Sequence, residues 1–255
     1  MDILMRDGVR IAYEATGTGT PILLTHGYSA TAGMWRGQVA AFAPRYRVIT
    51  WDMRGHGASD SPAALDEYSE AKTVGDMTAI LDALGIERAV IGGLSLGGYM
   101  SLAFHLAHPD RCLALILCDT GPGYRNPQAR DAWNETAEKR AVAFETQGLA
   151  ALGRSPEVVA TAASHRSAQG LASAARGMLK QFDARVIDHL PDIRVPTLII
   201  VGENDTPYIP GSQYMAAKIP GARLVMIPGA GHAANIDQPA AFNKAVLDFL
   251  AEHGL

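Results

Sequence analysis

Short apolar runs alternate along the chain with longer segments whose apolar residues recur every three or four positions. The short runs predict buried strands and the longer segments predict helices. This alternation is typical of an α/β fold, in which helices cover both faces of a largely parallel sheet. Runs of strand character occupy residues 2–6, 9–14, 21–25, 46–51, 89–91, 113–118, 195–201 and 223–227, and helical spacing occupies 31–42, 69–84, 96–107, 212–219 and 238–252.

The first two strand runs flank Asp7-Gly8, a sequence that favours a tight hairpin. We therefore expect an antiparallel pair at the start of the chain and parallel strands after it. The sequence predicts a mostly parallel sheet of about eight strands flanked by helices.

Residues 121–190 interrupt this rhythm. The strand pattern disappears, and the segment is rich in alanine, with breaks at Pro127, Gly148, Gly153, Ser155-Pro156 and Gly170. The segment spans only some 70 residues and lies between strands of the same kind. We therefore expect a helical insertion, not an independent domain, with residues 1–120 and 191–255 forming one core.

The stretch Gly93-Leu94-Ser95-Leu96-Gly97 lies where an apolar strand gives way to a helix. A strand that turns sharply into a helix brings neighbouring backbone close, and glycine avoids the clash of a Cβ. The G-x-S-x-G pattern in this context predicts a strained, exposed nucleophilic serine. A glycine-rich turn with an incidental serine is the alternative.

Six of the predicted strands are each followed, within a few residues, by a polar side chain that could take part in catalysis. The carboxyl ends of parallel strands meet at one edge of a sheet, where ligands bind. These residues are His26, Asp52, Ser95, Asp119, Asp205 and His232.

A serine hydroxyl needs a base to take its proton and an acid to orient that base. His232, among small residues in Gly229-Ala230-Gly231, fits the base, and Asp205 fits the acid. Asp119 is an alternative acid, Asp205 an alternative turn cap, and His232 alternatively a structural loop histidine. The remaining helix histidines are expected to face solvent: His105, His108, His165 and His189.

An acyl-transfer reaction also needs donors for the developing oxyanion. The backbone N–H of Leu96, at the start of the helix, and that of Tyr28, in the His26-Gly27-Tyr28 loop, are the candidates.

The composition of the chain limits the kinds of partner that it could bind. The net charge of −4 offers no basic surface for nucleic acid or an anionic membrane, and no apolar run of about 18 residues is present. The only cysteines, Cys112 and Cys118, lie on one predicted strand and are expected to be free thiols. We expect a cytoplasmic protein with a small-molecule substrate, no metal site and no cofactor.

The chain resembles the α/β-hydrolase family over nearly its whole length. The resemblance rests on His26-Gly27, Asp52-x-Arg54-Gly55-x-Gly57-x-Ser59, Gly93-Leu94-Ser95-Leu96-Gly97-Gly98, Gly202-Glu203-Asn204-Asp205 and Gly231-His232. It implies a Ser95–Asp205–His232 triad, an oxyanion hole from Tyr28 and Leu96, and a cap formed by the insertion. It also implies that Arg54 and His56 brace the turn beside the oxyanion loop. Serine at position 95 argues against the dehalogenase and epoxide-hydrolase branches, which use aspartate there.

Among the members that use serine, the chain resembles small esterases, enol-lactonases and carbon–carbon bond hydrolases. The expected function is hydrolysis of small carboxylic esters through an acyl-enzyme; a lactone or carbon–carbon bond substrate and a non-catalytic ligand sensor are alternatives. Candidate pocket residues in the insertion, each equally suited to its core, are Tyr124, Trp133, Phe144 and Phe182. Arg125, Arg140 and Arg176 suit either a carboxylate clamp or, more simply, an exposed helix face. The sequence leaves the oligomeric state open.

Overall fold

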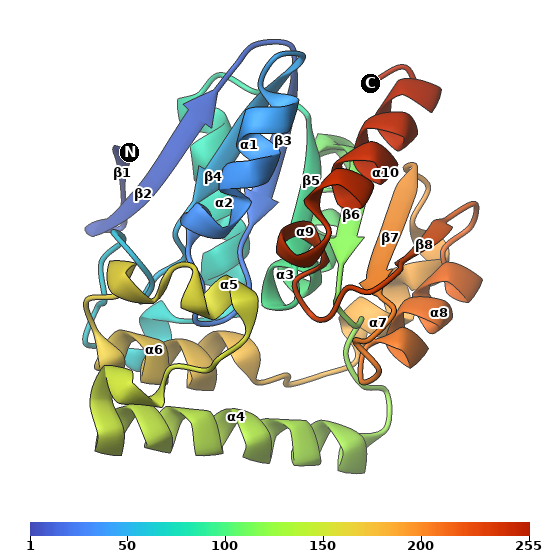
Figure 1. Ribbon diagram of the computed structural model, residues 1–255. Coiled ribbons are helices and arrows are strands. Elements are labelled where there is room, and N and C mark those ends of the chain that lie inside the picture. Colours follow the sequence, from blue (N-terminus) through green and yellow to red (C-terminus); the bar gives the residue numbers. More distant parts are fainter.

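A computed structural model describes residues 1–255 and contains one eight-stranded sheet with the order β1-β2-β4-β3-β5-β6-β7-β8 (Figure 1). β1 pairs antiparallel with β2, and β2 antiparallel with β4, while the other neighbours are parallel. The predicted mostly parallel sheet is confirmed. The strands are β1 Asp2–Arg6, β2 Val9–Thr16, β3 Thr20–Thr25, β4 Tyr46–Trp51, β5 Ala89–Leu94, β6 Cys112–Cys118, β7 Thr197–Gly202 and β8 Arg223–Ile227.

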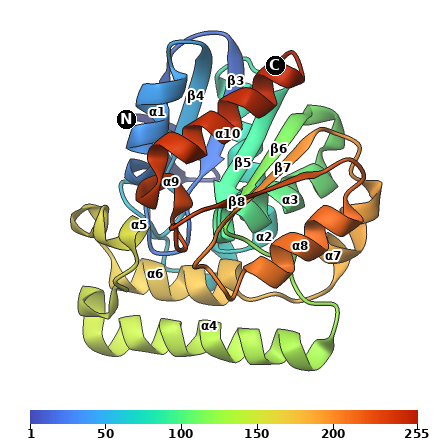
Figure 2. The same cartoon turned by 45° about the vertical axis from the view of Figure 1, so that its right-hand side comes forward.

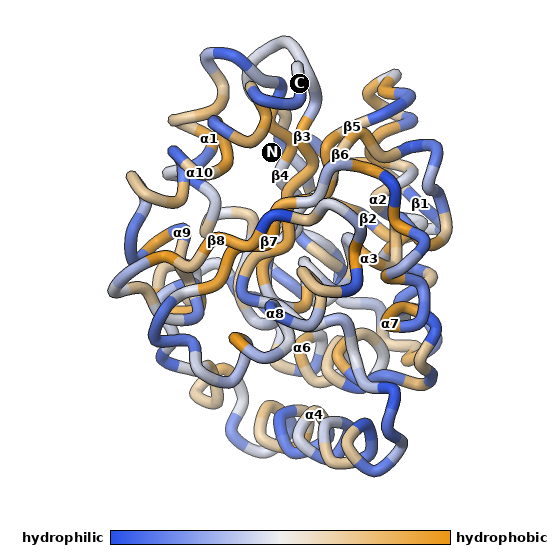
Figure 3. Tube along the Cα trace, turned by 90° about the vertical axis from the view of Figure 1, so that its right-hand side faces the viewer, coloured by the Kyte–Doolittle hydropathy of each residue, from blue (hydrophilic) through white to orange (hydrophobic).

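The central strands are continuous apolar runs because helices cover them on both sides. Every residue of β5 and β7 is buried. Figure 3 shows the middle of the sheet as its most hydrophobic part, with polar residues gathered in the surrounding loops and helices. The edge strand β1, in contrast, is mainly exposed.

Two helical layers enclose the sheet. α1, α9 and α10 pack together on one face, and α2, α3 and α8 lie on the other (Figures 1 and 2). Their bounds are α1 Arg36–Phe42, α2 Glu70–Ala83, α3 Leu96–Ala107, α8 Ile209–Lys218, α9 Ala234–Asp237 and α10 Pro239–Glu252. Ser69 caps α2 by accepting a hydrogen bond from the Lys72 N–H, at the position expected for a helix start.

Between β6 and β7 the chain contains only helices and loops. The long helix α4, Pro127–Gln147, begins at one predicted break and is followed directly by another, its C-cap Gly148. The other helices are α5 Pro156–Val159, α6 Ala168–Ala174, its π-helical continuation Ala175–Leu179, and α7 Arg185–His189. α4 packs against α6, and Figure 1 shows both crossing beyond the lower ends of the strands.

Some element boundaries differ from the prediction. Residues 31–42 form a 3-10 helix, Ala32–Trp35, followed by α1, and α8 begins at Ile209, ahead of Pro210. The short helix α9 was not predicted, because four residues carry too little periodicity. The remaining 3-10 helices are Leu65–Glu67, Pro109–Arg111, Gly148–Ala151, Ala162–Ser164 and Leu190–Asp192.

No helix of the structure combines the length and the apolar character that crossing a bilayer requires.

Candidate active site

Ser95 occupies the turn between β5 and α3. Its backbone has φ 54° and ψ −116°, a conformation that residues other than glycine rarely adopt. Its backbone is held in this state from both ends. The Ser95 N–H donates to the Cys118 carbonyl at 2.9 Å, and its own carbonyl accepts from the Thr120 hydroxyl at 2.6 Å. The predicted strain is present, and the turn leaves the serine partly accessible.

The glycines around Ser95 are sterically required. A Cβ on Gly93 would lie 2.3 Å from the Gly97 carbonyl carbon, and one on Gly97 would lie 2.2 Å from the Thr25 carbonyl oxygen. Both obstacles are backbone atoms, which cannot move aside as a flexible side chain can. The pattern around Ser95 therefore reflects close packing of α3 against β3.

His232 and Asp205, the predicted base and acid, come from the loops after β8 and β7. The Nδ1 atom of His232 lies 2.9 Å from Oδ2 of Asp205. Burial lowers the pKa of His232, but the hydrogen bond and charge of Asp205, together with the charges of Glu157 and Asp119, outweigh burial and raise this pKa above its ordinary value. The Tyr208 ring packs beside the imidazole, with centroids 4.6 Å apart and the ring planes tilted by 37°.

Asp119, the alternative acid, does not bond to His232. Its carboxyl group accepts hydrogen bonds from the Gly202 N–H at 2.7 Å and the Ala234 N–H at 3.2 Å. Burial raises the pKa of Asp119 to about 7. Asp119 thus ties together the two segments that carry Asp205 and His232.

Two buried histidines hold the loop that contains Tyr28. The Met53 N–H donates to Nε2 of His26, and the Ser29 N–H donates to Nε2 of His56. Each ring therefore carries its proton on Nδ1, which faces a backbone carbonyl. Burial lowers the pKa of His26 to about 4 and that of His56 well below its ordinary value, so both stay neutral.

The side chain of Tyr28 forms a hydrogen bond within the protein, whereas its backbone N–H does not. The hydroxyl donates to the Leu171 carbonyl at 2.8 Å, linking this loop to α6. The Tyr28 N–H makes no hydrogen bond within the protein. Leu96 is the first residue of α3, where the N–H has no partner within the helix. Both predicted oxyanion donors are therefore unoccupied.

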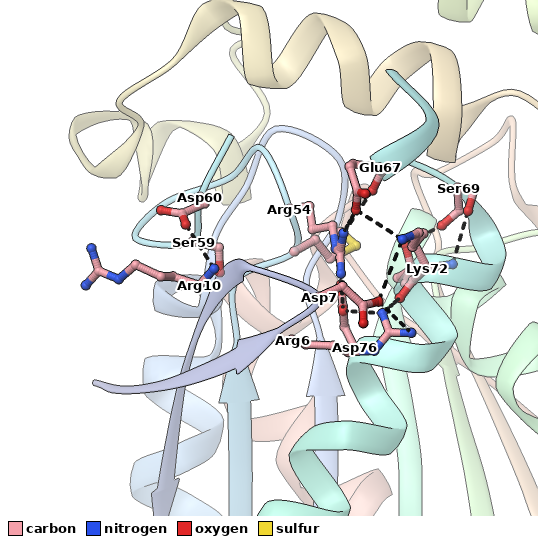
Figure 4. A network of polar contacts seen from close by, with 12 residues as sticks. Arg6, Asp7, Arg10, Arg54, Ser59, Asp60, Glu67, Ser69, Lys72 and Asp76 are labelled. Carbon is pink, nitrogen blue, oxygen red and sulfur yellow. Dashed lines mark hydrogen bonds and ion pairs between the residues drawn. The ribbon is translucent and has the colours of Figure 1, made fainter. Parts of the chain in front are cut away.

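Arg54 follows β4 and is buried in a charged network (Figure 4). Its guanidinium binds both carboxylate oxygens of Asp76 at 2.7 and 2.8 Å, and it also pairs with Glu67. Arg6 contacts Asp76 at 2.8 Å from the other side. The network joins α2 to the loop that carries His56, a bracing arrangement of the kind that the family resemblance implied.

Two cavities adjoin Ser95. The first, which we call the His232 cavity, has a volume of about 470 Å³ and is also lined by Tyr28, Asp205 and Glu157. The second, the Tyr124 cavity, has a volume of about 500 Å³ and is also lined by Leu96 and Gln181. The two cavities share Ser95, Trp133, Arg140, Leu179 and Tyr208.

Three of the four predicted pocket aromatics line these cavities: Tyr124, Trp133 and Phe144. Trp133 and Phe144 also serve the core of the insertion, since Trp133 donates to the Leu179 carbonyl and Phe144 is buried against Tyr28. The prediction for Phe182 is wrong, because its side chain is 71% exposed and lines neither cavity. Its position just after the helical segment turns it outward.

The cavities contain residues that the sequence did not single out, notably Tyr208 and Glu157. Glu157 is 4% exposed; its Oε1 accepts from the Ser155 hydroxyl, but its Oε2 has no hydrogen-bond partner. No local pattern distinguishes these residues from ordinary loop or helix positions.

Two histidines expected to face solvent are buried. His105 lies beside His189, with ring nitrogens 3.0 Å apart, and His165 contacts the Ser29 carbonyl at 2.8 Å. Both lie where another element packs over their own, which a single segment cannot reveal. No group of three or more His, Cys, Asp or Glu side chains is arranged to hold a metal ion.

A model of the alpha/beta hydrolase family matches residues 22–245. The chain is 31% identical to 3-oxoadipate enol-lactonase 1 of Acinetobacter baylyi, covering 97% of this chain and 96% of the relative.

Two solved structures are also similar. The enol-lactonase from Burkholderia xenovorans LB400 has a TM-score of 0.84 and 29% identity, covering 98% of this chain and all of that one. A thermophilic esterase from Thermogutta terrifontis, with malate bound, has a TM-score of 0.82 and 31% identity, covering 96% and 94%. The resemblance to esterases and enol-lactonases is confirmed, and these relatives support a hydrolase. The chain belongs to the alpha/beta hydrolase family.

Proposed function

We propose that this protein is a serine hydrolase that cleaves small carboxylic esters through an acyl-enzyme intermediate. The observation that carries the proposal is the hydrogen bond between His232 and Asp205 in the cavity that also contains the strained Ser95. This combination of nucleophile, base and orienting acid is what acyl transfer requires.

In the proposed reaction, Nε2 of neutral His232 takes the proton of Ser95 as its Oγ attacks the ester carbonyl. Asp205 accepts from Nδ1–H, which keeps the proton on that nitrogen and stabilises the imidazolium as it forms. The imidazolium then gives its proton to the departing alcohol. Water, activated by the same imidazole, hydrolyses the acyl-enzyme and releases the carboxylic acid.

The backbone N–H groups of Tyr28 and Leu96 are the proposed donors for the oxyanion. Their lack of partners within the protein supports this role. Each such donor typically contributes a few kcal/mol to stabilising the transition state, provided that its direction is fixed. The hydrogen bonds from Met53 and Ser29 to the two buried histidines would fix the loop that carries Tyr28.

We further propose that residues 121–190 act as a cap that selects the substrate. Trp133, Phe144 and Arg140 of this segment line the cavities next to Ser95. His165, from the same segment, contacts the loop that carries Tyr28. The cap would thus contact both the substrate and the oxyanion loop.

The test is hydrolysis of 4-nitrophenyl butyrate by the wild type and by Ser95→Ala. We expect Ser95→Ala to lose at least about 10³-fold in kcat, while retaining the wild-type unfolding curve. Ser164→Ala, at an exposed serine outside both cavities, is the matched control and should keep wild-type kinetics. Equal turnover by the wild type and Ser95→Ala would refute the nucleophile assignment. Ligand binding without an acylation burst in the wild type would instead favour a sensor.

A lactone is the second candidate substrate, because the relative from Acinetobacter baylyi and the structure from Burkholderia xenovorans are both named enol-lactonases. Opening a lactone uses the same attack on an acyl–oxygen bond. Comparing kcat/KM for α-angelica lactone, an enol lactone, with that for 4-nitrophenyl butyrate decides between them. A ratio well above one favours the lactone.

A further inference from the structure

Charge is distributed unequally between the two cavities at Ser95. Among the residues that line the Tyr124 cavity there is one charged side chain, Arg140, and no acidic one. The His232 cavity contains the same arginine together with Arg154, but also the carboxyl groups of Asp205 and Glu157. An anion near Ser95 is therefore favoured on the side of the Tyr124 cavity, where no carboxylate repels it.

Arg140 has no polar partner within the protein, as is also true of Arg154, but only Arg140 lines the Tyr124 cavity as well as the His232 cavity. Arg125 pairs with Asp188, Arg176 with Glu138 and Glu145, and Arg185 with Glu70. Arg140 makes no ion pair and no hydrogen bond to another residue. Its side chain is exposed to solvent where it lines both cavities, so the guanidinium is free to bind a ligand.

The guanidinium is nevertheless positioned close to the candidate catalytic residues. Its Cζ atom lies 5.9 Å from the centroid of the Tyr28 ring, within the range of a cation–π contact. Burial raises the pKa of Tyr208, whose ring packs beside His232, and the positive charge of Arg140 opposes that rise. Arg140 therefore lies near Tyr28 of the oxyanion loop and near Tyr208, the neighbour of His232.

The proposed mechanism determines which part of a substrate would occupy each cavity. The imidazole that takes the serine proton must later reach the departing oxygen, so the alcohol lies toward the cavity that contains His232. The acyl chain then extends into the Tyr124 cavity, away from Asp205 and Glu157. This step rests on the proposed function.

We propose that Arg140 binds a carboxylate at the far end of the acyl chain, so that the preferred substrates are mono-esters of dicarboxylic acids. The planar guanidinium donates two parallel hydrogen bonds to a carboxylate, which gives both affinity and orientation. Hydrolysis of such a substrate consumes one water and yields a dicarboxylate and a neutral alcohol.

The test compares mono-(4-nitrophenyl) adipate with 4-nitrophenyl hexanoate, which has an acyl chain of the same length without the carboxylate. The readout is the ratio of their kcat/KM values, with spontaneous hydrolysis subtracted. We expect the wild type to prefer the adipate, and Arg140→Gln to reduce the ratio about 10- to 100-fold, as expected for loss of a charged hydrogen-bonded pair. Arg140→Lys should give an intermediate ratio. Lys139→Gln, which removes the adjacent exposed charge of the same helix, should retain the wild-type ratio.

A third substrate checks which side of the ester carries the anion. We expect 4-(hexanoyloxy)benzoate, with its carboxylate on the leaving group, to gain nothing from Arg140. A ratio that is unchanged in Arg140→Gln overturns the inference, as does an Arg140-dependent preference for the benzoate. Loss of all turnover in Ser95→Ala together with an unchanged ratio in Arg140→Gln overturns this inference alone. Full turnover in Ser95→Ala overturns the proposed function.

Discussion

Ser95 adopts a backbone conformation with positive φ that costs an ordinary residue roughly 1–3 kcal/mol. Contacts in the folded protein must offset that cost. They include the two backbone hydrogen bonds that Ser95 makes with the Cys118 carbonyl and the Thr120 hydroxyl. The neighbouring glycines allow α3 to approach β3 closely enough for these contacts. At the residue scale, the nucleophile turn is therefore a packing arrangement as much as a chemical one.

Gly97→Ala tests this packing. The added Cβ would lie 2.2 Å from the Thr25 carbonyl oxygen, a backbone atom that cannot yield. We expect the free energy of unfolding in urea to fall by at least about 3 kcal/mol. Gly37→Ala is the control, because Gly37 lies exposed in α1 with open space around it, and it should stabilise the protein by about 0.5–1 kcal/mol. Similar effects of the two substitutions would contradict the steric explanation.

The charge on His232 sets the acid limit of the proposed activity. The base must be neutral, and Asp205 and Glu157 both raise the pKa of His232. We expect kcat/KM to fall as pH decreases, with a midpoint above pH 6.5. Glu157→Gln removes one of these charges, so the midpoint should move to lower pH. Glu138 forms a surface ion pair with Arg176, and the control variant Glu138→Gln should leave the midpoint of the pH profile unchanged. A midpoint that does not respond to Glu157→Gln would show that this carboxyl does not act on His232.

At the scale of elements, loops in this protein are held by buried polar groups that reach across the fold. Asp119 bonds to the segments that carry Asp205 and His232, and Arg54 joins the loop after β4 to α2. Such groups are costly to bury alone but strongly coupled to their partners. Replacing such a group is therefore expected to weaken the contact between the two segments that it connects.

Arg54→Met leaves the carboxylate of Asp76 buried, with only Arg6 as a partner. We expect a loss of about 3–5 kcal/mol in the free energy of unfolding, measured by urea denaturation. The double variant Arg54→Met/Asp76→Leu should recover much of this loss, because the buried carboxylate is no longer present and Arg6, which loses it as a partner, is partly exposed. Arg223→Met, which breaks an exposed pair with Glu252, is the control and should change stability little. A double variant no more stable than Arg54→Met would contradict this account.

The whole molecule contains several buried histidines that are neutral when folded. Burial lowers the pKa values of His26 and His105 to about 4, and lowers those of His56 and His165 as well. In the unfolded chain these histidines have the ordinary pKa of 6.5 and therefore bind protons more readily than in the folded protein. Their contribution to stability is therefore complete above pH 6.5 and is lost as pH falls toward 4.

We expect the free energy of unfolding to decrease by several kcal/mol between pH 7 and pH 4.5, since the shift of His26 alone corresponds to roughly 3 kcal/mol. Asp119 and His232 act in the opposite direction, because their raised pKa values favour the protonated folded state as pH falls. These two groups offset only part of the effect of four histidines. Urea denaturation at intervals of half a pH unit measures the balance. A flat profile would contradict the neutral, buried assignment of the histidines.

The sequence alone determined the alternation of strands and helices, the antiparallel start, the helical stretch between β6 and β7, and the turn at Ser95. These features follow from local spacing and glycine sterics, which are properties of consecutive residues. The sheet edge to which Ser95, Asp205 and His232 belong could be predicted as well, because parallel strands end on the same side.

Only the tertiary structure decided how side chains from distant segments meet. In the folded protein Asp119 accepts hydrogen bonds from backbone N–H groups, whereas Asp205 pairs with His232. His105 and His165 are buried and Phe182 is exposed. Arg140 lines a cavity at Ser95 without a polar partner. Burial and charge pairing at these positions depend on what another element places against them. A periodic pattern records only which face of its own segment is apolar, so it does not contain that information.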